Sequence, residues 1–458
     1  MSRPRDTWRN CRSAAPRWQG ATSENIGDIR PSRNAASGDA PPGSYAANHA
    51  VGTLVSRRLL ALWAAWVVVG AGATLSAQEP AEPPPGLNRN APVGDVLTFL
   101  LTNQSVPTGD FVKDTEAAAV TAGTISRLLL TELTTLPLGS SSAGFTYRVN
   151  PQLGTVERAS QSFGPFFAER SLTAGRGQAS IAVTLQFADY TRLNDVALDS
   201  GTLVTTANQF RDEAEPFDVE ALTLEIQSRT LTVLGNVGLT DWMDVSVAVP
   251  IVSLSLEGSR VNTYRGERLL QATGTAETTG LGDMALRAKV RLYGDGASGL
   301  ALVGESRLPT GSEENLLGSG EASFGAMLVG SYEPGRFAAH ANAGLTRGGL
   351  LDEVTYRGAI SFAASPRITL LGEVLGRRLE GIGRLAQERA PHPTIPGVDT
   401  LRLISTGSDV NTSAATAGMR WNVAGAWLLN AGVTVPVRNH GLRSQTTVVV
   451  GLDYAFGG

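Results

Sequence analysis

Apolar and polar residues alternate along residues 241–258, which read DWMDVSVAVPIVSLSLEG. Every second residue from Met243 to Ile251 is apolar, whereas the residues between them, such as Asp244 and Ser246, are polar or small. A period of two places the two sets on opposite faces of a β-strand. The same alternation recurs from residue 179 to the C-terminus, so this region is predicted to be all-β.

The alternation predicts twelve strands, and most are close to the roughly 9–11 residues that a tilted membrane strand requires. They are 179–188, 219–239, 243–256, 281–293, 299–309, 320–333, 336–347, 355–365, 367–379, 412–423, 425–436 and 443–456. Tight connections (240–242, 294–298, 334–335, 366 and 424) alternate with longer ones (189–218, 257–280, 310–319, 348–354, 380–411 and 437–442). This alternation is typical of one antiparallel transmembrane β-barrel with periplasmic turns and extracellular loops.

The faces of the strands indicate which side meets lipid. In DMALRAKVRLY (283–293), apolar residues alternate with three cations, and buried cations need water or a partner. Their face is therefore predicted to line the lumen, and the apolar residues from Met243 to Ile251 are predicted to face lipid. The residues predicted to line the lumen are Arg287, Lys289, Arg291, Glu305, Arg307, His340, Asn342, Glu373, Arg377, Arg420 and Asp453.

Aromatic residues lie beside the tight turns, as a girdle at the membrane interface requires. A soluble half-buried sheet would show the same alternation, but it would not gather aromatics at one end. The last strand, in SQTTVVVGLDYAFGG, resembles the C-terminal signal that the barrel-assembly machinery recognises, although Gly457 and Gly458 follow the final aromatic. The predicted girdle residues are Trp242, Trp421, Trp427, Tyr454 and Phe456.

The apolar phase slips by one residue in two places, around Ile251 and Val252 and around residues 228–230. A β-bulge would produce such a slip. Alternatively, these strands extend beyond the membrane, where the pattern relaxes.

The region before the barrel divides by composition. Residues 55–77 carry two arginines, an apolar run too short for a spanning helix, and small residues, which predicts a signal peptide. Residues 1–54 are interpreted as a mis-called start or a disordered extension, and 78–93 as a Pro-rich linker. Residues 94–178 are interpreted as a periplasmic or plug segment, in which 110–137 is the only sustained helical candidate. The barrel is assigned to 179–458.

Composition excludes several classes. The net charge of −4 gives no basic bias toward nucleic acid. Cys11 is the only cysteine, so no internal disulfide can form. His392 and His440 lie in loop-like stretches, and His340 is expected to be a polar lumen residue. No metal-ligand spacing, phosphate-binding loop or nucleophile elbow is present, so we expect no enzyme activity, metal or cofactor.

The stretch TGLGDMALRAKVRLYGDGASGLALVGESRLPTGS (279–312), followed by LGSG (317–320), resembles the outer-membrane family labelled MetA-pathway of phenol degradation. Members of that family are often described as transporters, and the resemblance extends over about 160–456. It implies an outer-membrane channel for small solutes, among them hydrophobic or aromatic compounds. The alternative is a structural or surface-interaction barrel with an occluded lumen.

The ladder formed by Arg287, Lys289 and Arg291 gives the channel hypothesis an electrostatic consequence. Cations at alternate positions lie about 6–7 Å apart and raise the potential in a narrow tube. The channel is then expected to favour anions. The competing expectation is that Glu305 and other acidic groups pair with the ladder, which leaves it a structural part of the wall.

Overall fold

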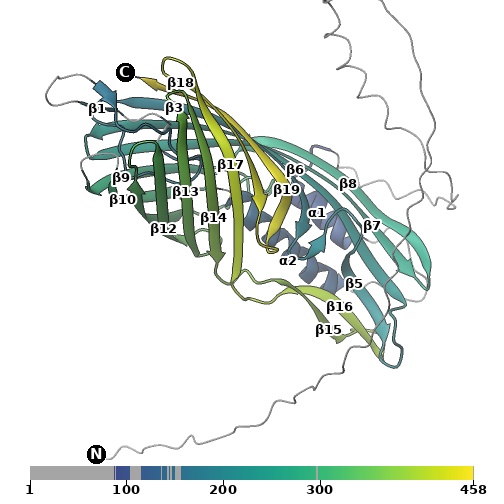
Figure 1. The fold of residues 1–458 in the computed structure, drawn as a ribbon. Helices are drawn as coiled ribbons and strands as arrows, with labels where there is room; N and C mark the ends of the chain where they lie inside the picture. The colour runs from purple at the N-terminus through teal and green to yellow at the C-terminus, as the bar shows by residue number, and fades with distance from the viewer. Residues whose placement is uncertain are drawn as a thin grey trace, which may run out of the picture. The chain divides into compact units, whose positions relative to one another are not determined.

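The computed structural model describes residues 87, 89–103, 115–135, 137–141, 144, 147–149, 156–294 and 298–456. The interpretations of residues 1–54, 55–77 and 78–86 lie outside these residues. Within the described part, seventeen antiparallel strands close into a barrel (Figure 1), whereas β1 (Tyr147–Val149) and β2 (Val156–Arg158) pair only with each other.

Twelve of these strands run along the barrel, and each corresponds to one strand predicted from the sequence. They are β3 (Ala179–Leu193), β6 (Asp218–Thr240), β7 (Met243–Tyr264), β9 (Met284–Tyr293), β10 (Gly299–Leu308), β11 (Ser323–Tyr332), β12 (Phe337–Gly348), β13 (Glu353–Ser365), β14 (Ile368–Leu379), β17 (Val410–Ala424), β18 (Trp427–Pro436) and β19 (Leu442–Phe456). The pairing of β19 with β3 closes the barrel. The predicted closed barrel is therefore confirmed.

Three long connections contain strands, so their prediction as plain loops is wrong. Segment 189–218 contains β4 (Val196–Ala197) and β5 (Leu203–Phe210), 257–280 contains most of β8 (Glu267–Leu281), and 380–411 contains β15 (Leu385–Pro391) and β16 (Val398–Ser405). Strand β4 pairs with the end of β3, and the other strands pair with the long ends of β6 and β7 or with one another. They extend the wall at the end that carries the long connections, which we call the loop end. The other end, with the tight turns, is the turn end.

The slip in apolar phase is not a bulge. Strands β6 and β7 pair without a register shift from Asp218 opposite Tyr264 to Gly238 opposite Asp244. The even-numbered residues of β6 stay buried throughout. What changes along the strand is the polarity of each face. The inward face is polar at Thr232, Thr230 and Ser228 and becomes apolar at Ile226, Leu224 and Leu222. The outward face is apolar at Leu231 and becomes polar at Arg229, Gln227 and Glu225. The strand therefore leaves the membrane near Arg229, and its inner face there packs on apolar helices.

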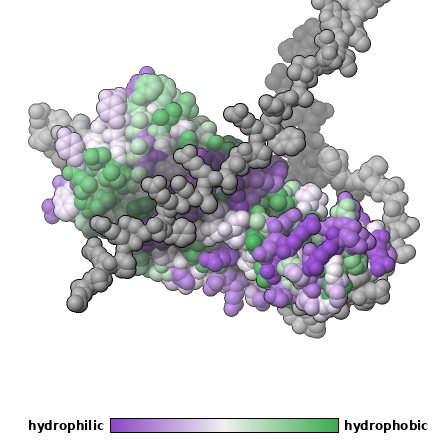
Figure 2. Space-filling model, turned by 90° about the horizontal axis from the view of Figure 1, so that it is seen from below, coloured by the Kyte–Doolittle hydropathy of each residue, from purple (hydrophilic) through white to green (hydrophobic). Residues whose placement is uncertain are grey.

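The outer surface is divided in the same way. Large apolar side chains are exposed on the outward positions of the twelve strands, for example Leu286, Leu302, Leu328, Val374 and Leu452. Figure 2 shows hydrophobic surface gathered on the left of the molecule and hydrophilic surface on the right, the side on which β5, β15 and β16 lie in Figure 1. An apolar band on a closed sheet is the surface that a bilayer requires.

Two helices lie inside the loop half of the barrel (Figure 1). Helix α2 (Thr115–Thr134) falls within the predicted 110–137, whereas α1 (Val93–Thr102) was not predicted. Helix α1 contacts β7 and β8, and α2 contacts β5, β16 and β19. Among the described residues, neither helix is both long and apolar enough to cross a bilayer.

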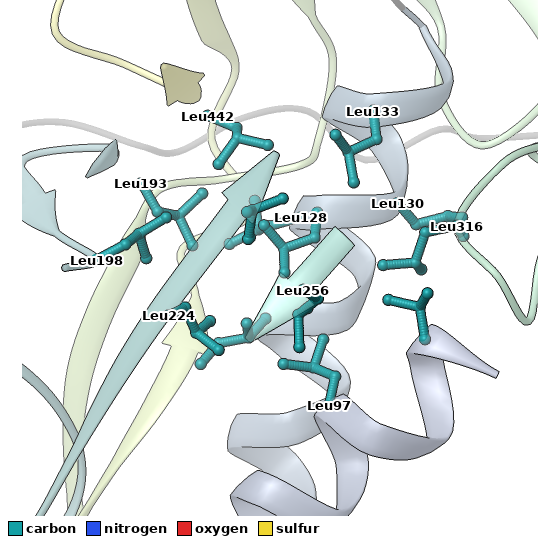
Figure 3. Close-up of a cluster of buried hydrophobic side chains, with 14 of the residues drawn as sticks. Leu97, Leu128, Leu130, Leu133, Leu193, Leu198, Leu224, Leu256, Leu316 and Leu442 are labelled. Atoms are coloured by element: carbon teal, nitrogen blue, oxygen red, sulfur yellow. The ribbon is translucent and has the colours of Figure 1, made fainter. Parts of the chain in front are cut away.

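Leucines hold the helices to the wall (Figure 3). Leu97 of α1 and Leu128 of α2 are buried in one cluster with Leu224 of β6 and Leu256 of β7. Burying one such side chain contributes roughly 1.5–3 kcal/mol. This cluster explains why the inner faces of β6 and β7 turn apolar at the loop end.

The described residues that precede the barrel contact its wall at both ends. At the loop end, the N–H of Glu277 on β8 donates to the carbonyl oxygen of Arg89 (3.1 Å). At the turn end, the Thr173 hydroxyl donates to the carbonyl oxygen of Asp241 (2.7 Å) in the tight turn between β6 and β7. The chain then enters β3 at Ala179.

These contacts predict from which side of the outer membrane a reagent can reach Arg89. If the loop end is extracellular, a cysteine in Arg89→Cys will react with a membrane-impermeant maleimide on intact cells. Arg89 is largely exposed, and its ion pair with Glu277 is a surface pair whose loss costs little. Pro396→Cys, at the loop end, should react likewise, and Asp241→Cys only after the outer membrane is opened. The reverse pattern would show that the orientation is inverted.

Candidate functional site

The residues predicted to line the lumen all lie on inward positions of their strands. Arg291 is half-buried near the turn end, in register with the inward Ala301. Arg307 and Arg377 keep small exposed fractions, and Glu305 keeps a larger one. The others are buried: Arg287, Lys289, His340, Asn342, Glu373, Arg420 and Asp453. These side chains contact protein, because the described residues 137–141, 144 and 160–174, which we call the inner segment, occupy the turn half of the lumen.

Glu169, on this inner segment, is the centre of the charge network. Its carboxylate lies 3.5 Å from the Nζ of Lys289 and 3.5 Å from a guanidinium nitrogen of Arg287. The N–H of Ser141 also donates to it (2.6 Å). Arg287 pairs in addition with Glu305 (2.6 Å). Two cations of the predicted ladder are therefore neutralised by paired carboxylates.

Other wall residues bind the backbone of the same segment. Glu373 accepts hydrogen bonds from the N–H groups of Phe167 and Ala168 (both 3.0 Å). The Asn342 amide donates to the carbonyl oxygen of Glu169 (2.9 Å) and accepts from its N–H (2.7 Å). These contacts satisfy backbone groups that would otherwise be buried without partners, which is costly.

Further contacts fix the segment near the turn end. Arg420 donates to the carbonyl oxygen of Pro165 and pairs with Asp453 (both 2.8 Å). The Ser331 hydroxyl accepts from the N–H of Ser171 (2.8 Å) and lies 3.0 Å from the Nδ1 of His340. His340 is therefore a buried structural residue of the wall. No group of three or more His, Cys, Asp or Glu side chains in the described part of the chain is arranged to hold a metal ion.

The loop half contains a cavity of about 240 Å³ beside the end of α2. Its lining includes Tyr190, Met327 and Leu375 from the wall, with Gly325 and Gly344 at inward positions that carry no side chain. Phe167 and Glu305 also line it, and the loops at 348–351 and 438–444 border it at the loop end. The cavity is therefore mostly apolar, with charged groups at a few fixed places.

Four of the charged groups that line the cavity form two ion pairs. Arg377 of β14 pairs with Glu132 of α2, and Arg307 of β10 with Glu305 (2.9 Å). Burial raises the pKa of the Glu132 carboxyl, and the charge of Arg377 offsets this only in part. The Arg377 guanidinium also donates to the carbonyl oxygen of Thr135 (3.0 Å). The end of α2 is thus tied to the wall beside the cavity.

The aromatic residues predicted as a girdle lie on outward positions near the turn end. Trp242, Trp421, Trp427 and Phe456 are exposed. The ring of Tyr454 lies 4.6 Å from that of Trp427, in a tilted arrangement, and 4.7 Å from that of Phe456, edge to face. The sequence analysis missed further exposed aromatics at the same end, Tyr293, Tyr332 and Phe337. Each begins or ends a strand beside a tight turn, which is the signal that would have identified them.

The site residues that the sequence analysis missed belong mostly to the inner segment, above all Glu169. The composition of the predicted lumen did indicate that such a residue was needed. Three adjacent cations without enough acidic residues on neighbouring strands require anions from elsewhere in the chain.

A closed antiparallel barrel with an apolar outer band, an aromatic end and a charged interior is an outer-membrane protein. The family model for the MetA-pathway of phenol degradation matches residues 207–365, which confirms the resemblance seen in the sequence. No curated protein matches the chain.

Several solved structures are similar to this chain. The COG4313 outer membrane channel from Pseudomonas putida F1 is 12% identical and has a TM-score of 0.39, over 62% of this chain and 98% of that one. The toluene transporter TbuX from Ralstonia pickettii is 9% identical, with a TM-score of 0.27, over 63% and 91%. The translocator domain of the autotransporter NalP from Neisseria meningitidis is 12% identical, with a TM-score of 0.27, over 61% and 88%.

Proposed function

We propose that this barrel transports a small, largely apolar solute across the outer membrane and that the described structure is its closed state. The observation that carries the proposal is the cavity inside the loop half, bordered by the loops on one side and by the inner segment on the other. Apolar pockets with a few fixed polar groups are typical binding sites for small molecules. A solute would enter from the loop end and remain bound in the cavity until the inner segment shifts.

The energetics of the two halves favour movement of the segment within the barrel. The leucine cluster of the loop half is stabilised by apolar burial. The ion pairs of the turn half gain little net free energy, because desolvation of the charges roughly offsets their attraction. We therefore propose that the turn half is the part that rearranges, provided that water entering the lumen solvates the charges that separate.

The second candidate function is a structural or surface-interaction barrel with an occluded lumen. The extent to which paired charges and backbone hydrogen bonds fill the turn half favours this candidate. The two candidates differ in whether any solute crosses the reconstituted protein.

The test fills the cavity while leaving the wall intact. Ala414 faces inward on β17 and lines the cavity, whereas its neighbour Ala415 lies on the opposite face. Ala414→Leu should reduce solute uptake into proteoliposomes several-fold and shift the size limit to smaller solutes. Ala415→Leu is the matched control and should behave as the wild type. Equal uptake by both variants would place the path elsewhere, and no uptake by any form would favour the structural barrel.

A further inference from the structure

The glycine-rich motif of 279–320 is more than a set of turns, because its separate parts meet in space. The Asp283 carboxylate accepts hydrogen bonds from the N–H of Gly311 (3.1 Å) and from the N–H (2.8 Å) and hydroxyl (2.7 Å) of Ser319. The Thr310 hydroxyl donates to the carbonyl oxygen of Gly282 (2.7 Å). We call Asp283, Thr310, Gly311, Gly318 and Ser319 the Asp283 clasp.

Two glycines make the clasp possible. A Cβ on Gly318 would lie 2.5 Å from the Cα of Gly311 and 2.5 Å from an oxygen of Asp283. Contacts this short do not occur, so the backbones approach each other only because both residues lack a side chain. The clasp therefore closes segment 312–317 into a compact loop.

That loop contacts helix α1 directly. The N–H of Gly94 in α1 donates to the carbonyl oxygen of Glu314 (2.8 Å). Pro92, at the N-cap of α1, gives no side-chain cap, so the loop supplies an acceptor that the first turn otherwise lacks. Leu316 and Leu317 are buried in the same leucine cluster as α1.

Leu316 shows that the loop conformation is imposed. Its φ of 57° lies in the left-handed region, which a leucine rarely adopts. Such a conformation persists only where the surrounding structure maintains it. The clasp at the two ends of the loop and the burial of Leu316 provide that constraint.

The clasp also borders the cavity, because Asp283 and Ser319 are among its lining residues. One group of side chains therefore touches the cavity on one side and fixes the loop that caps α1 on the other. From this geometry we propose that the Asp283 clasp is the latch that holds α1 in the mouth of the barrel. Its role in keeping a transport path closed rests on the proposed function.

The experiment measures the position of α1 and the passage of ions separately. In the full chain, Ala91→Cys places a thiol at a buried position just before α1. Adding Asp283→Asn removes the charged acceptor and turns an amide toward the donors of the clasp. We expect maleimide labelling of residue 91 to be about tenfold faster, the size expected for loss of one charge-assisted hydrogen bond. Single-channel recordings should show a comparable rise in open time.

Asp409→Asn is the matched control. Asp409 lies at the same end and accepts hydrogen bonds from Arg378 and from the N–H of Gly381 (3.2 Å), which lower the pKa of its carboxyl. It ties the end of β14 to the start of β17, so its loss should leave labelling of residue 91 unchanged. Ser319→Ala removes one donor of the clasp and should accelerate labelling by a smaller factor in a barrel that still folds.

The outcomes separate the two proposals. Unchanged labelling in both Asp283→Asn and Ser319→Ala would overturn the latch. Faster labelling with unchanged conductance would support the latch and count against the proposed transport. Faster labelling in Asp409→Asn as well would mean that the loop end loosens generally, which would also overturn a specific role of Asp283.

Discussion

Oxidation of a protein carrying Val96→Cys and Gly274→Cys is expected to abolish solute transport, and a reductant is expected to restore it. A Cβ on Gly274 of β8 would lie 2.9 Å from the Cγ1 of Val96 in α1. The two Cβ atoms then fall near the roughly 3.5–4.5 Å that a disulfide requires. The bond would fix α1 to the wall, and the latch proposed above must release α1 before a solute can pass.

Each single cysteine variant controls for the substitutions themselves and should transport under both conditions. Cys11 is the only native cysteine of the chain, so residues 179–458 contain no native thiol that could compete. Uptake is measured in proteoliposomes before and after reduction. Transport at the wild-type rate by the fully oxidised double variant would mean that solutes pass without movement of α1.

The twelve strands could be predicted because lipid imposes a single requirement on every outward position. Residues such as Leu286 and Val374 must be apolar, and closure of the sheet makes each strand repeat the pattern. Beyond Arg229 this requirement ends. The strands β5, β8, β15 and β16 have a solvated outer face and an inner face set by the helices, so their periodicity did not stand out from that of loops.

The residues of the lumen were predicted because their charges exclude them from the face that meets lipid. This explains why the prediction of their direction was correct and why their partners could not be predicted. Arg287 and Lys289 had to point away from lipid, and they do. What they would meet depended on a segment whose sequence carries no regular period. Glu169 lies more than a hundred residues before them in the chain, and only the fold brings it to 3.5 Å.

Helix α1 was missed for a physical reason as well. It has only 10 residues and no side-chain cap, and short isolated helices are marginal in water. Its stability comes from the wall, since Val96, Leu97 and Leu100 are buried and the carbonyl of Glu314 caps its first turn. The acceptor for the first turn of α1 therefore comes from Glu314, which is distant in the sequence, so no local capping residue marks the start of the helix.

Substitution of Glu169 should have the largest effect on the closed lumen. Glu169→Gln removes the carboxylate that lies 3.5 Å from both Arg287 and Lys289. Arg287 keeps Glu305, whereas Lys289 loses its nearest carboxylate and keeps Asp244 at 3.9 Å and the carbonyl oxygen of Arg170 at 3.4 Å. Removing one partner of a buried ion pair typically costs about 3–5 kcal/mol. We therefore expect the inner residues around Glu169 to leave the wall, with conductance rising more than tenfold.

The pore opened in this way should prefer anions, because the negative charge of Glu169 is gone while Arg287 and Lys289 still line a narrow path. A reversal potential measured in a salt gradient reports this preference, which the wild type should lack. Glu169→Gln combined with Lys289→Met is the matched variant, since an apolar side chain of similar length needs no counter-charge. It should close the lumen again and remove the leak. If Glu169→Gln folds and stays closed, the backbone contacts of Glu373 and Asn342 hold the segment without the charge network, and the ladder is only a part of the wall.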